Sequence, residues 1–320
     1  MKPVLLSLLN VSDVDRVRLG AYYEVLQVSN VAEASTLPPE TLQRVEALYG
    51  SATRQLSFEF LDSLPNLKVI SSFGVGFDPY DESYLKARKI RLGYTPDVLN
   101  DCVADLAIAL MLDCARELTA SDRYLRAGRW ISDGQFRLGV SVTGKRLGIL
   151  GLGRIGLEIA ERAKGFRMEI LYHNRKARSD VPEHYRYIES PIELAKQADF
   201  LIVATPGGPA TEKLVNQEVL QALGPDSYLI NIARGAVIDE EALVEVLKNK
   251  GIAGAGLDVF AHEPHVPEAL LALDNVILTP HIASATVETR NAMRELSIQN
   301  FLHFAESGEV KVAVPWANYS

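Results

Sequence analysis

Short apolar runs rich in Val, Ile and Leu alternate with helix-like stretches along the whole chain. This alternation is typical of parallel sheets built from strand–helix–strand units. In the first part of the chain we expect strands at residues 4–9, 23–27, 47–49, 67–73 and 90–94. In the second part we expect them at residues 147–150, 168–172, 200–204, 228–232, 255–259 and 276–279. The pattern predicts an α/β fold, and the second group of strands suffices for a complete dinucleotide-binding sheet.

Three further segments lie outside this alternation. Residues 100–118 begin with a polar residue and carry a dense apolar face, which predicts a long, mostly buried helix. Residues 119–144 show no clean periodicity, so we expect an irregular arm there. Residues 287–308 predict one more amphipathic helix, and residues 310–320 a short extended end. Cys102 and Cys114 fall in the same expected helix, too far apart along it to be neighbours, which argues against a disulfide.

The chain of 320 residues exceeds the size that one hydrophobic core usually serves. We therefore expect two doubly wound parallel-sheet domains, Rossmann-like or flavodoxin-like, with a cofactor cleft between them. Residues 99–286 would form the dinucleotide-binding domain, and residues 1–98 with 287–320 would form the substrate-binding domain. The chain would then cross between the domains near residues 97–101 and 284–290.

Charge and hydropathy argue against several classes of protein. The net charge is −8, and no run of Lys and Arg forms the basic face that is typical of nucleic-acid binders. No stretch approaches the roughly 18 consecutive apolar residues of a membrane helix. The apolar N-terminal stretch is too short for a signal peptide and fits the first strand instead. We expect a cytoplasmic protein that binds neither nucleic acid nor membrane, and we predict no metal site.

The first chemical motif is the glycine-rich sequence GLGRIG at residues 151–156. It follows an expected strand and opens an expected helix, which is the setting in which such a motif binds a dinucleotide. Gly151 permits a tight turn, Gly153 lets the backbone approach a pyrophosphate, and Gly156 lets the helix pack on the strand. Backbone N–H groups at the start of the helix then face the phosphates. We assign Gly151, Gly153, Arg154, Ile155 and Gly156 to cofactor binding.

The end of the next strand indicates which cofactor is preferred. An NAD-binding sheet usually carries an acidic residue there, which holds both hydroxyls of the ribose. This chain has Asn174, Arg175 and Lys176 at that place and no carboxylate. A planar guanidinium and an ammonium both favour a 2′-phosphate. The three residues therefore predict NADP, with NADPH preferred over NADH; the alternative is a solvated basic loop without a ligand.

Polar or otherwise unusual residues follow every strand of the second group. Ligands of such sheets bind outside the carboxyl ends of the strands. Arg234, Glu263 and His281 can therefore converge at one edge although they lie far apart in the sequence. Further candidates for cofactor contact at the same edge are Thr205, Pro206, Ile232 and Asp258.

The three converging residues fit the reduction of a 2-oxo acid. This reaction needs a cation that binds the carboxylate and polarises the carbonyl, and it needs a proton donor for the oxygen as a hydride reaches C2. Arg234 supplies the cation and His281 the proton. A carboxylate beside the imidazole orients the ring and favours its protonated form, which is the role that we predict for Glu263.

Two alternatives remain open at this stage. His262 and His265 flank Glu263 and compete with His281 for the role of acid, although His281 alone stands directly after a strand. Asp258 closes its strand, so it either holds the nicotinamide amide or stabilises the loop.

Residues 71–78, SSFGVGFD, follow a strand of the first group and contain two glycines. Closely spaced backbone N–H groups at Val75 and Gly76 would bind a substrate carboxylate. The alternative is a simple turn.

At this point the chain resembles the D-isomer-specific 2-hydroxyacid dehydrogenases. The resemblance covers essentially the whole chain through FGVGFD, TPDVLNDCVADLAIALML, GLGRIG, NIARGAVIDEEAL, GLDVF followed by EP, and LTPHIASAT. Within the family it resembles the glyoxylate and hydroxypyruvate reductase branch, mainly through HNRK and the short C-terminus. The resemblance implies Arg234, Glu263 and His281 as catalytic residues, a substrate pocket that includes Ser51, and a homodimer.

We therefore predict NADPH-dependent reduction of small 2-oxo acids, such as glyoxylate and hydroxypyruvate, to 2-hydroxy acids. Arg234 and His281 would bind the substrate together with Ser51, Val75 and Gly76. Two alternatives are a nucleotide-sensing corepressor or scaffold with the same fold, and an NAD-linked D-2-hydroxyacid dehydrogenase that takes a bulkier substrate.

Overall fold

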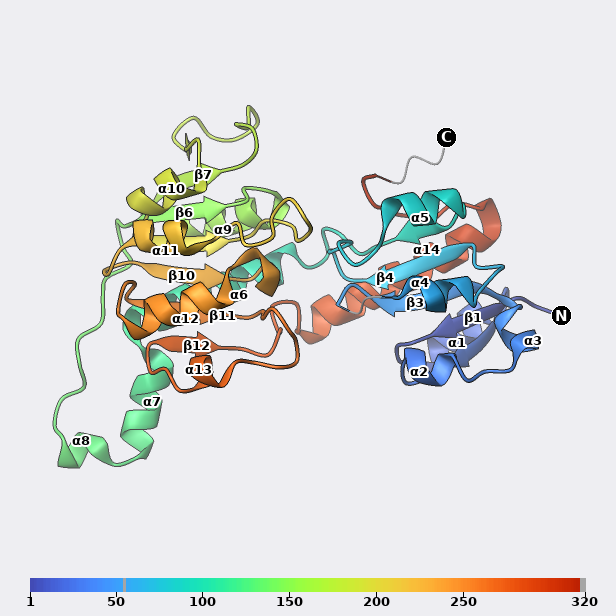
Figure 1. The fold of residues 1–320 in the computed structure, drawn as a ribbon, viewed down its shortest axis with the longest axis horizontal. Coiled ribbons are helices and arrows are strands. Elements are labelled where there is room, and N and C mark those ends of the chain that lie inside the picture. The colour runs from blue at the N-terminus through green and yellow to red at the C-terminus, as the bar shows by residue number, and fades with distance from the viewer. Residues whose placement is uncertain (54–55, 317–320) are drawn as a thin grey trace. The chain divides into compact units, whose positions relative to one another are not determined.

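The computed structural model describes residues 1–53 and 56–316, and the chain divides into two compact units. Unit 1 comprises Met1–Leu99 and Thr286–Ser320, and unit 2 comprises Asn100–Ala285. Figure 1 shows both units, each built on a parallel sheet with helices packed against it.

In the described part of unit 1, five parallel strands lie in the order β2-β1-β3-β4-β5, which is a flavodoxin-like order. The strands are β1 (Val4–Ser7), β2 (Glu24–Gln27), β3 (Val45–Ser51), β4 (Val69–Phe73) and β5 (Arg91–Gly93). The helices are α1 (Asp13–Leu19), α2 (Val31–Ala34), α3 (Pro39–Leu42), α4 (Phe58–Asp62), α5 (Glu82–Ala87) and α14 (Val287–Ser307). Successive residues of β1 point to opposite faces, so Leu5 belongs to the core cluster that contains Phe301 of α14, and Leu6 to the one that contains Phe60 of α4.

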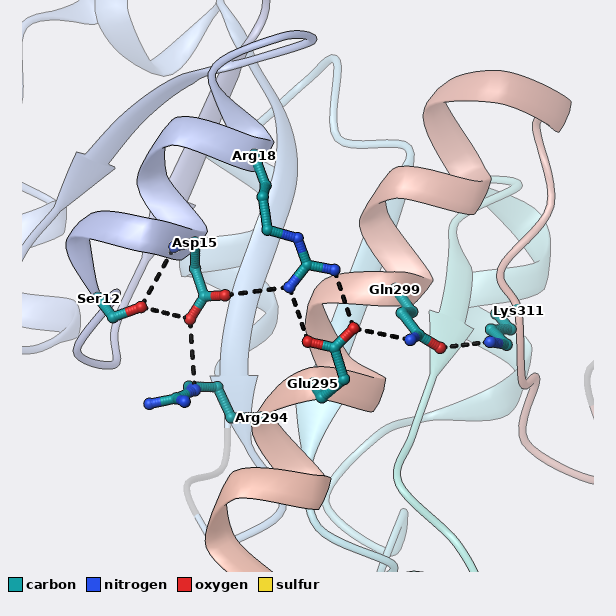
Figure 2. A network of polar contacts seen from close by, with 7 residues as sticks. All are labelled: Ser12, Asp15, Arg18, Arg294, Glu295, Gln299 and Lys311. Atoms are coloured by element: carbon teal, nitrogen blue, oxygen red, sulfur yellow. Dashed lines mark hydrogen bonds and ion pairs between the residues drawn. The ribbon is translucent and has the colours of Figure 1, made fainter.

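A chain of polar contacts joins α14 to α1 (Figure 2). The Arg18 guanidinium donates two hydrogen bonds to Glu295, at 2.7 and 2.8 Å, and also contacts the Asp15 carboxylate at 3.3 Å. Asp15 is buried and also pairs with Arg294 of α14 at 3.3 Å. We call this the α1–α14 network; its members are Ser12, Asp15, Arg18, Arg294, Glu295, Gln299 and Lys311. It connects the last helix to the first one, although nearly the whole sequence separates them.

In the described part of unit 2, seven parallel strands lie in the order β12-β11-β10-β9-β6-β7-β8. They are β6 (Arg146–Leu150), β7 (Glu169–His173), β8 (Arg186–Tyr187), β9 (Phe200–Val203), β10 (Tyr228–Asn231), β11 (Gly254–Leu257) and β12 (Val276–Leu278). The order reverses between β6 and β9, which is the point at which sheets of this kind bind ligands. The helices are α6 (Asn100–Arg116), α7 (Leu118–Arg126), α8 (Arg129–Ser132), α9 (Arg154–Lys164), α10 (Pro191–Gln197), α11 (Gln217–Leu223), α12 (Glu240–Lys248) and α13 (Glu268–Leu271).

The predicted α/β fold with two parallel sheets is confirmed, and every expected strand coincides with an observed one to within about two residues at either end. The strand β8 was not predicted, because two residues are too few to form a periodic pattern. The expected helix at 100–118 ends at Arg116, since Glu117 adopts a left-handed conformation with φ +53°. Cys102 and Cys114 both lie in α6 and are not joined by a disulfide, as expected.

The prediction of an irregular arm at residues 119–144 was wrong for its first half. The helices α7 and α8 occupy that half and stand away from the sheet of unit 2 (Figure 1). Ion pairs one helical turn apart, Asp122 with Arg126 and Arg129 with Asp133, support them. The large apolar side chains of these helices are exposed and do not pack against the sheet. Leu118 and Leu125, two helical turns apart, give α7 an apolar face that the prediction overlooked.

The C-terminal helix α14 is present as expected, but its buried face is partly polar. Asn300 is fully buried, donates to Ser71 and to the Tyr94 carbonyl at 3.3 Å, and accepts from Val312 at 3.0 Å. Of the expected extended end, Ala313 forms an antiparallel bridge with Gly93, and residues 317–320 lie outside the described residues. In the described part of the chain, no helix is long and apolar enough to cross a membrane.

Candidate active site

The strands β10, β11 and β12 are neighbours in the sheet of unit 2, and each is followed by one of the three predicted catalytic residues. Arg234 follows β10, Glu263 follows β11, and His281 follows β12. Because parallel strands present their carboxyl ends at one edge, these segments lie side by side.

The side chains of Glu263 and His281 form a hydrogen-bonded pair. The distance between His281 Nδ1 and Glu263 Oε2 is 2.7 Å, and the other carboxylate oxygen of Glu263 accepts a hydrogen bond from the backbone N–H of Phe260 at 3.1 Å. Burial acts to raise the pKa of Glu263, but the hydrogen bond and charge of His281, the Phe260 N–H and the charge of Arg234 outweigh it, so the net shift of the pKa is downward. A charged Glu263 binds one ring nitrogen of His281 and leaves the other for a substrate.

Arg234 lies on a turn that is held by the side chain of Asn231. The Asn231 amide donates to the Arg234 carbonyl at 3.1 Å and accepts from the Ala233 N–H at 3.0 Å, and its side chain is buried. Directly after Arg234, Gly235 lies against the loop of Glu263: a Cβ on Gly235 would be 1.8 Å from the carbonyl carbon of Phe260. Only glycine permits this approach, which brings the Arg234 turn next to the Glu263 loop.

Asp258 determines the conformation of the loop that carries His281. Its carboxylate is fully buried and accepts hydrogen bonds from the Thr279 hydroxyl at 2.7 Å and from the N–H groups of Ile282 and Ala283 at 2.8 and 2.9 Å. Its own carbonyl accepts from the N–H of His281, which adopts a left-handed φ of +52°. Of the two alternatives left open by the sequence, the geometry thus supports stabilisation of the loop.

The competing histidines occupy a different position. His262 and His265 are exposed and form a tight turn in which the His265 N–H donates to the His262 carbonyl at 2.8 Å. The side chain that the structure brings to the Glu263 carboxylate is that of His281.

The glycine motif forms the turn between β6 and α9. Gly151 has φ +103°, and a Cβ there would lie 2.7 Å from the Thr205 nitrogen; a Cβ on Gly156 would lie 2.4 Å from the Gly151 oxygen. A Cβ on Gly153 meets nothing within 4 Å, so this residue borders open space at the start of α9. Arg154 and Ile155 form the first turn of the helix. A tight turn, an open second glycine and a helix N-terminus are what a dinucleotide pyrophosphate requires.

The basic segment after β7 is tied to this turn. Asn174 accepts from the Leu152 N–H at 2.7 Å and donates to the Leu152 carbonyl at 3.3 Å, so its side chain positions the glycine-rich turn. Arg175 and Lys176 are exposed beside it. The Arg178 guanidinium also donates to the Leu152 carbonyl at 2.8 Å. The sequence analysis did not identify Arg178, because no local sequence pattern indicates this contact.

The remaining candidates for cofactor contact lie at the same edge of the sheet. Thr205 and Pro206 follow β9, where the Thr205 backbone packs against Gly151. Ile232 directly follows β10 and is mostly buried.

The candidates for substrate binding in unit 1 lie at the ends of two neighbouring strands. Ser51 ends β3 and hydrogen-bonds Thr53 at 2.8 Å, whereas Val75 and Gly76 follow β4. Gly74, with φ +145°, is held to Thr95 by two hydrogen bonds, of 3.0 and 2.9 Å, which fixes the start of the Val75–Gly76 turn.

Comparison with known proteins agrees with this geometry. Residues 108–283 match the model of the D-isomer specific 2-hydroxyacid dehydrogenase NAD-binding domain. The chain is 43% identical over 284 residues to the glyoxylate/hydroxypyruvate reductase A HPR2 of Arabidopsis thaliana (88% of this chain, 90% of the relative). It is 40% identical over 308 residues to the glyoxylate reductase of Pyrococcus horikoshii (93% and 92%).

A solved structure extends the likeness to the whole chain. The NADPH-dependent glyoxylate/hydroxypyruvate reductase of Sinorhizobium meliloti, in complex with NADP and malonate, superposes with a TM-score of 0.92. It is 41% identical in sequence, and the superposition covers 99% of this chain and 98% of that one. These matches confirm the resemblance to the reductase branch, and the chain is an NAD(P)-dependent oxidoreductase that belongs to the D-isomer-specific 2-hydroxyacid dehydrogenase family.

Proposed function

We propose that this protein reduces small 2-oxo acids, with glyoxylate and hydroxypyruvate as the principal substrates, and that it prefers NADPH over NADH. The observation that carries the proposal is the 2.7 Å contact between His281 and Glu263 beside the Arg234 turn. The names of the relatives, which are glyoxylate and hydroxypyruvate reductases, support the choice of substrate.

Each residue of the trio performs a separate task. The Arg234 guanidinium binds the substrate carboxylate and polarises the 2-oxo group. Because Nδ1 of His281 faces Glu263, Nε2 is the nitrogen that donates a proton to the carbonyl oxygen. Glu263 orients the ring and stabilises its positive charge before the proton is transferred. Bound NADPH would supply the hydride that adds to C2 of the substrate.

The cofactor preference is argued from Arg175, Lys176 and the missing carboxylate after β7. Both side chains are exposed next to the glycine-rich turn, as a contact with a 2′-phosphate requires. The turn of Gly151, Gly153 and Gly156 would hold the pyrophosphate, and Thr205, Pro206 and Ile232 would line the remainder of the cofactor site. Asp258 would contribute by holding the loop of His281. In unit 1, Ser51 and the N–H groups of Val75 and Gly76 would bind the substrate.

We further propose that the protein is a homodimer in which the α7–α8 arm takes part. Several large apolar side chains of this arm are exposed, with Ile131 at 96% and Trp130 at 63% of their full accessible surface. Exposed apolar surface on a projecting segment marks an interface. Light scattering with Ile131→Glu tests this: the variant should be monomeric, and a monomeric wild type would contradict the proposal.

The decisive experiment is a steady-state panel with NADPH and NADH as cofactors. The 2-oxo acids range from glyoxylate through hydroxypyruvate to phenylpyruvate. We expect the highest kcat/KM for the small acids with NADPH, and a loss of at least about a thousandfold in the Arg234→Ala variant. No turnover of any 2-oxo acid would refute the proposal, and a strong preference for NADH would refute its cofactor part.

A further inference from the structure

The basic segment after β7, residues 174–178, is hydrogen-bonded at both ends to Leu152, the second residue of the glycine motif. At one end, the Asn174 side chain binds the Leu152 N–H at 2.7 Å and the Leu152 carbonyl at 3.3 Å. At the other end, Nη1 of Arg178 donates to the same carbonyl at 2.8 Å. Both backbone polar groups of Leu152 are thereby engaged by this segment.

Arg178 is itself held from two further sides. Its backbone N–H donates to the hydroxyl of the buried Tyr172 at 3.0 Å, and the same hydroxyl lies 3.5 Å from its carbonyl oxygen. Its Nε and Nη2 atoms donate to the two oxygens of Asp180, at 2.8 and 2.6 Å. The planar fork of a guanidinium satisfies both partners at once, whereas an ammonium lacks this geometry. Asp180 also neutralises the charge of Arg178. These contacts hold the Arg178 side chain in one conformation, which fits a structural role.

The two cations that the proposed function assigns to the 2′-phosphate lie between these anchors. Arg175 and Lys176 are exposed, and only Ala177 separates them from Arg178. A segment this short, fixed at both ends, has few conformations to lose when it binds a ligand. Without the contact between Arg178 and the Leu152 carbonyl, Arg175 and Lys176 would become ordered only on binding, and this ordering would weaken the binding of the cofactor.

We infer that Arg178 is a positioning residue for cofactor selection: by binding the Leu152 carbonyl, it holds Arg175 and Lys176 at a fixed place beside the glycine-rich turn. This inference rests on the proposed preference for NADPH and deepens it. Arg178 acts through its neighbours and does not itself bind the phosphate. NADH lacks the 2′-phosphate, so the fixed position of Arg175 and Lys176 contributes much less to its binding.

The test compares kcat/KM for NADPH with kcat/KM for NADH in the full-length protein, with glyoxylate at a saturating concentration. In Arg178→Gln we expect the ratio of the two to fall about tenfold, while the value for NADH changes by less than about threefold. Arg178→Lys keeps the charge but not the fork, so the ratio should fall by a similar factor. Arg186→Gln removes a more exposed ion-paired arginine of unit 2 and should leave the ratio as in the wild type.

A double-mutant cycle separates positioning from direct contact. If Arg178 acts through the neighbouring cations, Arg178→Gln should change the ratio by less than about twofold in a protein that already carries Arg175→Ala and Lys176→Ala. An undiminished effect in that background would show that Arg178 binds the phosphate itself and would overturn the inference. A wild-type ratio in Arg178→Lys, or an equal loss for both cofactors in Arg178→Gln, would also overturn it. A wild-type protein without preference for NADPH would overturn the proposed cofactor as well, which distinguishes the two failures.

Discussion

Gly235 lies so close to Phe260 that a Cβ on the glycine would be 1.8 Å from the carbonyl carbon of the phenylalanine. Gly235 directly follows Arg234, and the N–H of Phe260 binds the carboxylate of Glu263. This backbone contact therefore sets the spacing between the turn of Arg234 and the loop of Glu263.

Gly235→Ala should separate these two segments. The atoms that a methyl group would meet belong to the backbone and cannot rotate away. A displacement of about 1 Å in a catalytic group costs on the order of a hundredfold in rate, so we expect kcat/KM to fall by at least that factor. Steady-state kinetics and a thermal melt check this. Gly165→Ala, where a Cβ comes no closer than 3.4 Å, is the control and should behave as the wild type. Full activity in Gly235→Ala would contradict the role of this contact.

Gly153→Ala should weaken the cofactor complex without loss of stability. A Cβ at Gly153 meets nothing within 4 Å, whereas one at Gly156 lies 2.4 Å from the Gly151 oxygen. Replacing glycine by alanine without strain stabilises a protein by about 0.4–1 kcal/mol, so the melting temperature of Gly153→Ala should not fall. The added methyl occupies the approach of the pyrophosphate, and we expect Kd for NADPH to rise about tenfold or more, measured by fluorescence titration. Gly156→Ala should instead lower the melting temperature. An unchanged Kd in Gly153→Ala would remove this glycine from the proposed cofactor site.

The sequence was informative wherever a regular pattern or a general rule applied. Apolar runs predicted the strands, since a buried parallel strand is apolar on both faces. The rule that ligands meet the carboxyl ends of strands predicted that Arg234, Glu263 and His281 would lie together, and the order β12-β11-β10 places the preceding strands side by side.

The features that the sequence did not predict depend on contacts between distant segments. Nothing near Arg178 indicates that its guanidinium binds the Leu152 carbonyl, 26 positions earlier. Asp258 was recognised as a strand-end residue, but its hydrogen bonds to Ile282 and Ala283 depend on how two loops fold against each other. The helix α7 has an apolar face, so the sequence did contain a signal for it, whereas the four residues of α8 are too few to form a periodic pattern.

Glu263→Gln should change both the rate and the pH dependence of reduction. The pKa of Glu263 is raised by burial but lowered more strongly by His281, the Phe260 N–H and Arg234, so the side chain is a carboxylate at neutral pH. A glutamine has nearly the same shape but does not stabilise a protonated imidazole. We expect kcat for reduction to fall about a hundredfold, because general acid catalysis typically contributes that much or more.

The sign of the pH effect follows from the same charge. The wild type carries the charged carboxylate only above the lowered pKa of Glu263. Its advantage in rate over the variant should therefore be constant near neutral pH and shrink as the pH falls through that pKa, in reduction and in oxidation alike. Rate profiles measured in both directions check this. Glu268→Gln, on α13, is the control and should keep the wild-type profile. A rate ratio between wild type and Glu263→Gln that does not change with pH would mean that the charge of this carboxylate does not contribute to catalysis.

Glu295→Gln should destabilise unit 1 in a pH-dependent way. The hydrogen bonds from Arg18 are the largest cause that lowers the pKa of Glu295 to about 2; burial opposes them, and Gln299 and the charges of Arg18 and Lys311 add to them. The pKa of Glu295 is lower in the folded protein than in the unfolded chain, where it is near 4.5. The carboxylate therefore stabilises the fold at pH values above about 4.5, and this stabilisation is lost as the pH falls toward 2. The Glu295 side chain is 46% exposed, so screening by solvent limits its contribution to about 0.5–1 kcal/mol.

The variant should therefore melt about 2 °C below the wild type at pH 7, and the gap should stay constant down to about pH 5 and narrow at lower pH. High salt should narrow it as well, since the network is partly exposed. Differential scanning calorimetry of both proteins between pH 7 and pH 3 measures the gap. Glu288→Gln, outside the α1–α14 network, controls for the loss of a negative charge from the same helix. A gap in Glu295→Gln that is equal at all pH values would arise from lost packing, because only the charged carboxylate forms the ion pair with Arg18.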